Sequence, residues 1–285
     1  MFLKMFSVQH SPGRTCIVVF ITAIFLLCCS SSDALLNQDK GIWEEYKTPH
    51  FVVYYDKAVP RQYVLQVGAN CENYYKSIAG KLGFVRSDFW YGNDRAEVFV
   101  YATQSEYVEH ARAAAWAGGH VFSKQKEIRT FQSDDAFFDN ILPHELAHMI
   151  FREFVGYTTP VPLWFEEGFA CLNEKTFIER YVLPGAEHVS NKGLFVPAEE
   201  LSMLSPSRVD PPIAFYLEAS VIMFYLAEGC GRGKLSKFCK ALRDRVRFDD
   251  AFEKIYHISS LNELGVEVEG YFKKNKVTGS EEIYW

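Results

Sequence analysis

The sequence lacks several features that would assign it to a class at once. It has no internal repeat and no low-complexity tract, which excludes repeat architectures. It has no excess of basic residues, because 30 Lys and Arg stand against 36 Asp and Glu, and a net charge of −6 argues against nucleic-acid binding. Its seven cysteines fit neither a disulfide scaffold nor a cysteine-ligated zinc site. What is present is a chain of 285 residues, 48% hydrophobic and 16% aromatic, enough for one sizeable core or two joined subdomains.

One apolar run stands near the N-terminus and indicates a leader over residues 1–34. Lys4 and Arg14 precede the run Cys16–Cys29, which has about the length of a signal-peptide core and is shorter than the roughly 18 residues that span a bilayer. The leader predicts that the protein is exported from the cytoplasm.

Three fates of the leader stay open. Small residues before Leu35 fit cleavage after Ala34, which would release a secreted chain. The segment Leu26–Ser30 resembles a bacterial lipobox with Cys29 as the lipid-bearing residue, which would tether the protein to a cell-envelope membrane. A retained signal anchor is the third alternative. We favour the lipoprotein slightly.

Four cysteines follow the leader. Cys230 and Cys239 are the closest pair in sequence, and export permits a bridge between them. Buried free thiols are an equally good interpretation of Cys71, Cys171 and this pair.

The most informative segment is His144-Glu145-Leu146-Ala147-His148. On a helix, residues four apart share a face, so His144 and His148 can present two imidazoles to one metal ion. Glu145 stands beside them as a general base, able to take a proton from a metal-bound water and pass it to a leaving amine. The alternative is a surface helix with two solvated histidines.

A second segment favours the metal site. A catalytic zinc takes three protein ligands and leaves one position open, and Glu167 follows His148 after eighteen residues, on a helix of its own with Pro162 at its start. Glu166 is the alternative ligand on the same turn. The pattern predicts one Zn²⁺ per chain, held by His144, His148 and Glu167.

These residues resemble the gluzincin metallopeptidases, the thermolysin-like group with two His and one Glu as zinc ligands. The spacing and the run Trp164–Ala170 look most like the zinc site of the aminopeptidase N family and of the small bacterial peptidase-MA-like domains. The resemblance covers roughly residues 140–172 and implies His144, His148 and Glu167 as ligands with Glu145 as base. It also implies a thermolysin-like fold with the zinc site in a cleft.

The chain departs from this family at two places. Aminopeptidases of this type carry, in a strand before the first ligand, a Glu that binds the substrate's amino group; here Val121 stands near that position. Cleavage of internal bonds is therefore favoured, with Glu127 as the amine-binding acid if the protein is an aminopeptidase after all. Cys171 replaces the Asp that in thermolysin follows the ligand Glu by four residues, so the partner that orients the histidines is not predicted.

A donor that stabilises the oxyanion should complete the site. Tyr216 is the candidate, because the family places a tyrosine in its helical subdomain for this purpose; a core aromatic is an equal alternative. His120 on the edge strand is a second candidate, and a structural histidine is the commoner case.

The periodicities predict an α+β fold, a mixed sheet with helices followed by a helical subdomain, with domains at 35–172 and 173–285. Strands are expected at 51–55, 96–101 and near 117–122, and helices at 62–82, 104–115 and from near Pro143 to Val155, with a left-handed stop at Gly156. Later helices are expected at 216–228, 235–246 and 249–256, with a capping box of Ser260 and Glu263 opening the last one.

The sequence thus predicts an exported zinc metallopeptidase that acts on a peptide or protein substrate, with endopeptidase activity favoured over aminopeptidase activity. The hypothesis from another class is a zinc-stabilised cell-envelope scaffold without turnover. The oligomeric state is not predicted.

Overall fold

The structure is a computed structural model, and it describes residues 43–83, 89–111, 118–133, 137–205, 208–209 and 213–275. The leader, with Cys29 and Ala34, lies outside these residues. Within the described part no single helix has the length and hydropathy to cross a membrane; one bent pair, Ile213–Gly229 with Gly233–Arg243, passes by length and composition alone.

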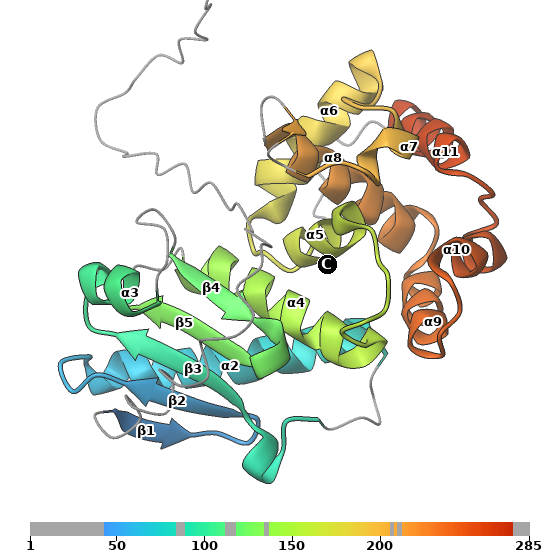
Figure 1. The fold of residues 1–285 in the computed structure, drawn as a ribbon. Helices are drawn as coiled ribbons and strands as arrows, with labels where there is room; N and C mark the ends of the chain where they lie inside the picture. The colour runs from blue at the N-terminus through green and yellow to red at the C-terminus, as the bar shows by residue number, and fades with distance from the viewer. Residues whose placement is uncertain are drawn as a thin grey trace, which may run out of the picture.

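A five-stranded mixed sheet forms the first half of the molecule (Figure 1). Its order is β1-β2-β3-β5-β4, where β2, β3 and β5 run parallel and the two edge strands β1 and β4 run antiparallel to their neighbours. The bounds are β1 Glu44–Lys47, β2 Phe51–Tyr55, β3 Ala96–Tyr101, β4 Gly119–Phe122 and β5 Glu127–Phe131. The expected edge strand is therefore confirmed as β4.

Helices cover both faces of the sheet, and the larger hydrophobic core lies on one of them. Apolar residues of β2, β3 and β5 such as Val53, Val98 and Ile128 join the main core with α2 (Arg61–Lys81) and α4 (Leu142–Val155). The other face carries a smaller aromatic cluster with α3 (Gln104–Ala111). The alternation of side chains along each strand separates the two sets.

The second half is helical, as expected, and packs onto α4 through α5 and α9, while α8 packs against α5. Its helices are α5 Leu163–Cys171, α6 Leu183–Lys192, α7 Ala198–Leu201, α8 Ile213–Phe224, α9 Arg232–Arg243, α10 Phe248–Tyr256 and α11 Leu261–Lys274. Wider π-helical turns stand at Phe137–Ile141, Ile178–Val182 and Tyr225–Gly229, and short 3₁₀ turns at Gly92–Asp94 and Ser123–Gln125. The α+β class is confirmed.

Several local expectations are corrected in detail. Gly156 ends α4 with a φ of 97° and a ψ of 138°, so its φ is positive as expected, yet it is not in the left-handed helical conformation. The capping box forms only in part. Ser260 Oγ accepts a hydrogen bond from the Glu263 amide, but the Glu263 carboxylate accepts from the amide of Ser259. Cys230 and Cys239 are free thiols, as are Cys71 and Cys171.

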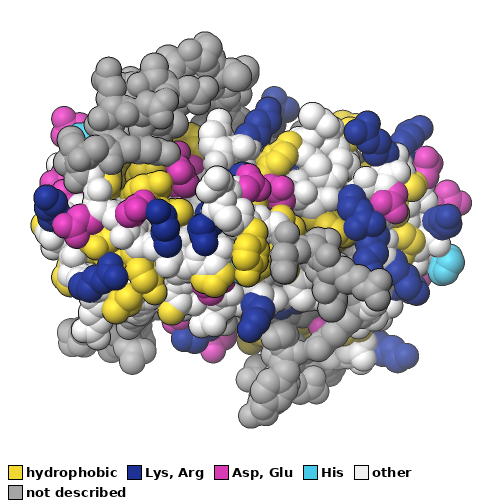
Figure 2. All heavy atoms as spheres, turned by 90° about the horizontal axis from the view of Figure 1, so that it is seen from below, with side chains coloured by type: hydrophobic (Ala, Val, Ile, Leu, Met, Phe, Trp, Pro, Cys, Tyr) yellow, Lys and Arg dark blue, Asp and Glu magenta, His cyan; other side chains and the backbone are white. Residues whose placement is uncertain are grey.

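Charged side chains of both signs are intermixed on the face seen in Figure 2. This distribution fits the small negative net charge and shows no single-sign field on that face.

Candidate metal centre

Pro143 explains how α4 starts and what lies beside it. Proline has no amide hydrogen, so the carbonyl four residues earlier, that of Asp139, loses its helical donor. The amide of Lys175 takes its place at 2.7 Å, and Thr176 Oγ1 donates to Asn140 Oδ1 at 2.5 Å. The segment that follows α5 is thereby tied to the start of α4, which brings Glu174 next to His144.

Three side chains converge between α4 and α5. His144 Nε2 and His148 Nε2 lie 3.2 Å apart, and Glu167 Oε2 lies 3.5 Å from the first and 3.6 Å from the second. Donor atoms around a tetrahedral zinc at 2.0–2.1 Å stand about 3.3 Å from one another. All three side chains are buried, so the predicted ligand set is brought together with nearly the spacing that zinc requires.

Glu167 gives a second indication that a cation belongs here. Its side chain is 1% exposed, and among the described residues neither carboxylate oxygen has a hydrogen-bond partner. A buried carboxylate without hydrogen bonds is strongly unfavourable unless a cation compensates it. The residues present therefore fit a divalent metal ion.

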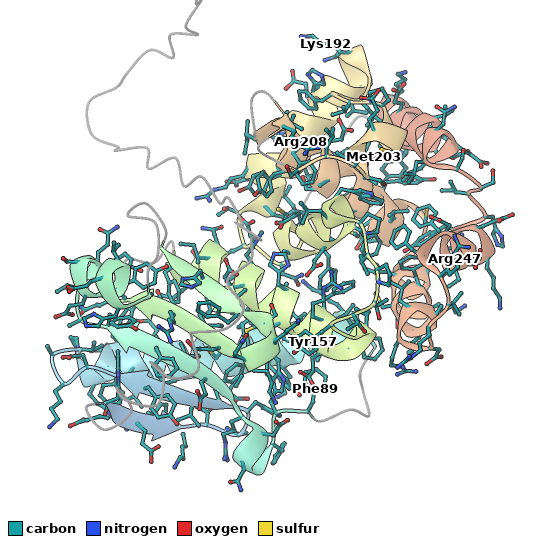
Figure 3. The ribbon with its side chains drawn as sticks, in the orientation of Figure 1. Phe89, Tyr157, Lys192, Met203, Arg208 and Arg247 are labelled. Carbon is teal, nitrogen blue, oxygen red and sulfur yellow. The ribbon has the colours of Figure 1, made fainter. Side chains whose placement is uncertain are left out.

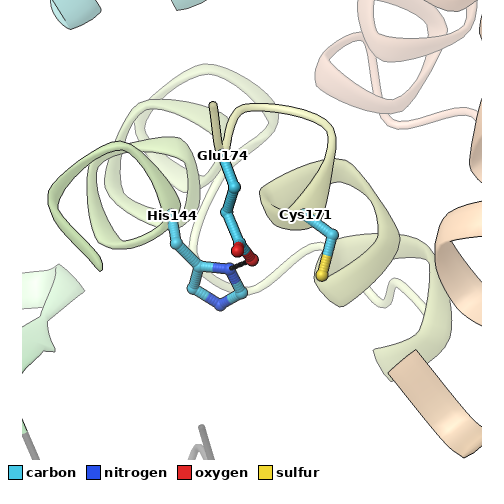
Figure 4. A group of neighbouring side chains, drawn as sticks. All are labelled: His144, Cys171 and Glu174. Atoms are coloured by element: carbon cyan, nitrogen blue, oxygen red, sulfur yellow. Dashed lines mark hydrogen bonds and ion pairs between the residues drawn. The ribbon is translucent and has the colours of Figure 1, made fainter. Parts of the chain in front are cut away.

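The outer nitrogens of both histidines face carboxylates. Glu174 Oε1 lies 3.1 Å from His144 Nδ1, and Figure 4 shows this contact beside Cys171. Glu166 Oε1 lies 3.4 Å from His148 Nδ1, and Glu166 is itself held by Arg152, whose Nε donates to it at 3.0 Å. These carboxylates turn the Nε2 atoms toward Glu167 and raise their basicity. Glu166 is thus an orienting partner, and the alternative that made it the metal ligand is not what the geometry favours.

A second group, His144 with Cys171 and Glu174, also has its potential ligand atoms close together. It shares His144 with the first group, and the Nδ1 contact to Glu174 already accounts for that side of the ring. Burial and the neighbouring carboxylates of Glu174 and Glu167 raise the pKa of the Cys171 thiol well above its usual value, and only a thiolate binds metal well. The group that contains Glu167 is therefore the better candidate for holding a metal ion.

The charges of the site are strongly coupled. Burial lowers the pKa of His144, but the adjacent Glu167 and Glu174 outweigh it and raise that pKa to about 9; His148 is raised likewise by Glu167 and Glu166. Burial raises the pKa of Glu167, and the two histidines more than reverse this, to about 2. These shifts couple metal binding to proton release, because a histidine must be deprotonated to bind a metal ion.

Glu145 directly follows the candidate ligand His144 on α4 and is half-buried. Burial raises the pKa of its carboxyl group, which suits a group that must accept and then return a proton. It follows Ile141 by four residues and so shares that residue's side of the helix. Ile141 packs against Gly118 and Gly119, where a Cβ on Gly118 would overlap Ile141 Cδ1. Glu145 therefore faces the start of β4.

The other predicted residues are distributed around this centre. Tyr216 is buried on α8, one turn before Ala219, whose carbonyl a Cβ on Gly168 would overlap. It thus lies one turn from a close contact between α8 and the helix that carries Glu167, and its role as oxyanion donor stays a prediction. His120 is half-buried on β4, with Nδ1 3.2 Å from the hydroxyl of Tyr107.

The residues proposed for amine recognition have other contacts. Val121 packs against the main core, and Glu127 is buried and ion-paired with Arg129. The negative charge of Glu127 is already compensated, which argues against its binding a substrate ammonium group.

Glu174 and Arg152 are the site residues that the sequence did not indicate. Glu174 follows the end of α5 at Cys171, so helical periodicity does not place it; the bonds of Lys175 to Asp139 and of Thr176 to Asn140 do. A hollow of about 290 Å³ lies elsewhere, between Lys192–Ala198 and Asn262–Glu269. Side chains fill much of the space between the sheet half and the helical half (Figure 3), and a substrate cleft beside the histidines stays a prediction.

In comparisons with known proteins, no family model matches this chain and no curated protein sequence matches it. The functional argument therefore depends on the geometry of the centre.

Proposed function

We propose that the protein is an exported zinc-dependent metallopeptidase of the gluzincin type, with a thermolysin-like arrangement, that hydrolyses internal peptide bonds. The observation that carries the proposal is the spacing of 3.2, 3.5 and 3.6 Å among His144 Nε2, His148 Nε2 and Glu167 Oε2. A zinc ion held by these residues would supply Lewis-acid polarisation and lower the pKa of a coordinated water.

Each of the other side chains at the site has its own role in the proposed reaction. Glu145 accepts a proton from the attacking water and delivers it to the leaving amine, and its raised pKa favours the return of that proton. Glu174 and Glu166 hold the imidazoles in place. Tyr216 is the proposed donor to the oxyanion.

Two alternatives are ranked below this function. An aminopeptidase needs an acid free to bind an ammonium group, and both the Glu127–Arg129 ion pair and the apolar contacts of Val121 oppose it. A scaffold without turnover needs no base beside the ligands, whereas Glu145 stands there with a raised pKa.

The decisive experiment compares ligand variants with a base variant in the purified mature protein. His144→Ala and Glu167→Ala are expected to lower zinc content and thermal stability, because bound metal stabilises the folded state. Glu145→Gln is expected to keep about one zinc per chain and to lose peptide cleavage almost entirely.

Substrates with acetylated and free amino termini separate the two peptidase activities. Blocked peptides should be cut, because no amine-binding acid is expected in the site. Cleavage of free amino termini only would establish the aminopeptidase. Zinc binding without any cleavage in a broad library, or full activity in Glu145→Gln, would establish the scaffold.

We further propose that export leaves the protein as a cell-envelope lipoprotein, on the pattern around Cys29. The protein should then partition with membranes, and Cys29→Ala should abolish lipid labelling. A mature amino terminus at Leu35 would contradict the tether.

A further inference from the structure

The outer side of His144 carries a second group of potential ligand atoms. Cys171 ends α5 and Glu174 follows it by three residues, and both side chains are buried beside the imidazole (Figure 4). One ligand atom from each of the three residues lies within 4.8 Å of the other two. On this side the ring presents Nδ1, which contacts Glu174 Oε1 at 3.1 Å, whereas Nε2 faces Glu167.

The Glu174 carboxylate has one oxygen left for a ligand. Its Oε1 accepts from His144 Nδ1, but among the described residues its Oε2 has no hydrogen-bond partner. The side chain is 0% exposed, so bulk water does not replace that partner. A buried carboxylate oxygen without a partner is unfavourable, and a cation would compensate it. This observation is independent of the thiol beside it.

The group needs little rearrangement to hold an ion. Donor atoms around a cation at about 2.0–2.3 Å stand about 3.3–3.8 Å from one another. Each pair of ligand atoms therefore has to approach by no more than about 1.5 Å, which small side-chain rotations provide.

The ligand types select the class of cation. A sulfur ligand favours soft cations, whereas Mg²⁺ and Ca²⁺ prefer sites made of oxygen atoms. Burial and the carboxylates of Glu174 and Glu167 raise the pKa of the Cys171 thiol, so only a cation that binds sulfur strongly replaces its proton. A thiophilic divalent cation such as Cd²⁺ meets this requirement.

The ring of His144 belongs to both groups, and it limits them. A neutral imidazole has a free lone pair on only one nitrogen, because the other nitrogen carries the proton. Zinc at Nε2 requires the proton on Nδ1, where Glu174 accepts it. A cation at Nδ1 requires the proton on Nε2, which faces Glu167. The two cations therefore compete for one ring, and their like charges also repel each other.

We propose that Cys171, Glu174 and Nδ1 of His144 form a second cation site, which takes a thiophilic divalent cation and competes with zinc at the candidate centre. When the cation binds, its bond to sulfur replaces the S–H bond and the thiol proton leaves to solvent. The inference rests on the proposed peptidase function and names a form of its regulation, which is inhibition by soft cations that added zinc reverses.

Cadmium titration of the zinc-loaded mature protein tests the site. Cd²⁺ on a thiolate gives an ultraviolet sulfur-to-cadmium charge-transfer band, so the wild-type protein should show this band and release zinc, measured by ultrafiltration and elemental analysis. Cys171→Ala should lose the band and should need about 10-fold more Cd²⁺ for half release of zinc, because the sulfur ligand is gone. The control Cys230→Ser removes a half-buried thiol elsewhere and should keep both responses. Mg²⁺ should release no zinc.

Peptide cleavage provides a second readout. Cd²⁺ should inhibit the wild-type protein, and added zinc should restore cleavage. Cys171→Ser keeps the size of the side chain and should also lose the band, so it takes the place of the alanine variant if circular dichroism shows that variant to be unfolded.

A charge-transfer band of equal strength in the folded Cys171 variant and in wild type overturns the proposal, as does a wild-type protein without the band. Zinc release at the same Cd²⁺ concentration in both proteins also overturns it, because cadmium would then replace zinc directly at Glu167. If the wild-type protein cleaves nothing, the peptidase function fails, while the band and the zinc release still decide the second site.

Discussion

Removal of the Glu174 carboxylate should weaken zinc binding without removing a ligand. Glu174 Oε1 accepts from His144 Nδ1 at 3.1 Å, and both side chains are almost fully buried, at 0% and 1% exposure. A hydrogen bond to a charged group contributes about 1.5–3 kcal/mol, which corresponds to roughly 10–100-fold in affinity and agrees with the usual effect of losing such a partner. Glu174→Ala should therefore raise the zinc dissociation constant by about 10–100-fold.

The assay is competition with a chromophoric chelator at neutral pH, with circular dichroism to confirm folding. Glu174→Gln keeps an acceptor oxygen and loses only the charge, so its loss should be smaller, about 10-fold or less. Glu179→Ala removes an exposed carboxylate from the same segment and should bind zinc like wild type. Wild-type affinity in Glu174→Ala, or an equal loss in Glu179→Ala, would refute the reasoning.

Two further outcomes follow from α8. Tyr216→Phe should slow turnover on the order of 10²-fold at unchanged zinc content if the hydroxyl stabilises the oxyanion, and unchanged turnover removes Tyr216 from the site. Burial raises the pKa of Glu218 from 4.5 to about 7, although hydrogen bonds from the backbone amides of residues 195 and 196 lower it. The folded state therefore keeps this proton to a higher pH than the unfolded state does. Stability is then present in full below pH 4.5 and falls as pH rises to about 7, by up to about 3 kcal/mol. Glu218→Gln should flatten this part of the pH dependence in thermal unfolding, and an unchanged profile would contradict the shift.

Much of the fold was predictable because its elements have strong local signals. The strands Phe51–Tyr55 and Ala96–Tyr101 match their expected bounds, since β-branched and aromatic residues stand between clear breaks. The sequence did not predict α6 and α7 as separate helices, because Pro184, Gly185 and Pro197 interrupt the helical spacing of the apolar residues there. In α6 the proline is tolerated in the first turn, where its missing amide hydrogen is of no consequence.

The ligand set was predictable from spacing, but its surroundings were not. A separation of four residues on one helix fixes the relation of His144 to His148. Glu174 is brought to His144 by long-range bonds, among them the backbone bond between Lys175 and the carbonyl that Pro143 leaves free. Pro143 was informative about the helix start, and its effect on Glu174 depends on tertiary structure that no local pattern encodes.

The number of protein ligands distinguishes a catalytic zinc site from a structural one. Structural zinc sites are closed by four protein ligands, whereas catalytic sites use three and leave a position open. Among the described His, Cys, Asp and Glu side chains, only His144, His148 and Glu167 converge on the proposed ion, and the nearby Cys171 and Glu174 group with the other side of His144. Glu145, which a fourth-ligand role would have drawn into this group, instead faces β4 with a raised pKa. A zinc ion held by these three side chains would keep one coordination position open beside Glu145, which is the arrangement that the hydrolysis we propose requires.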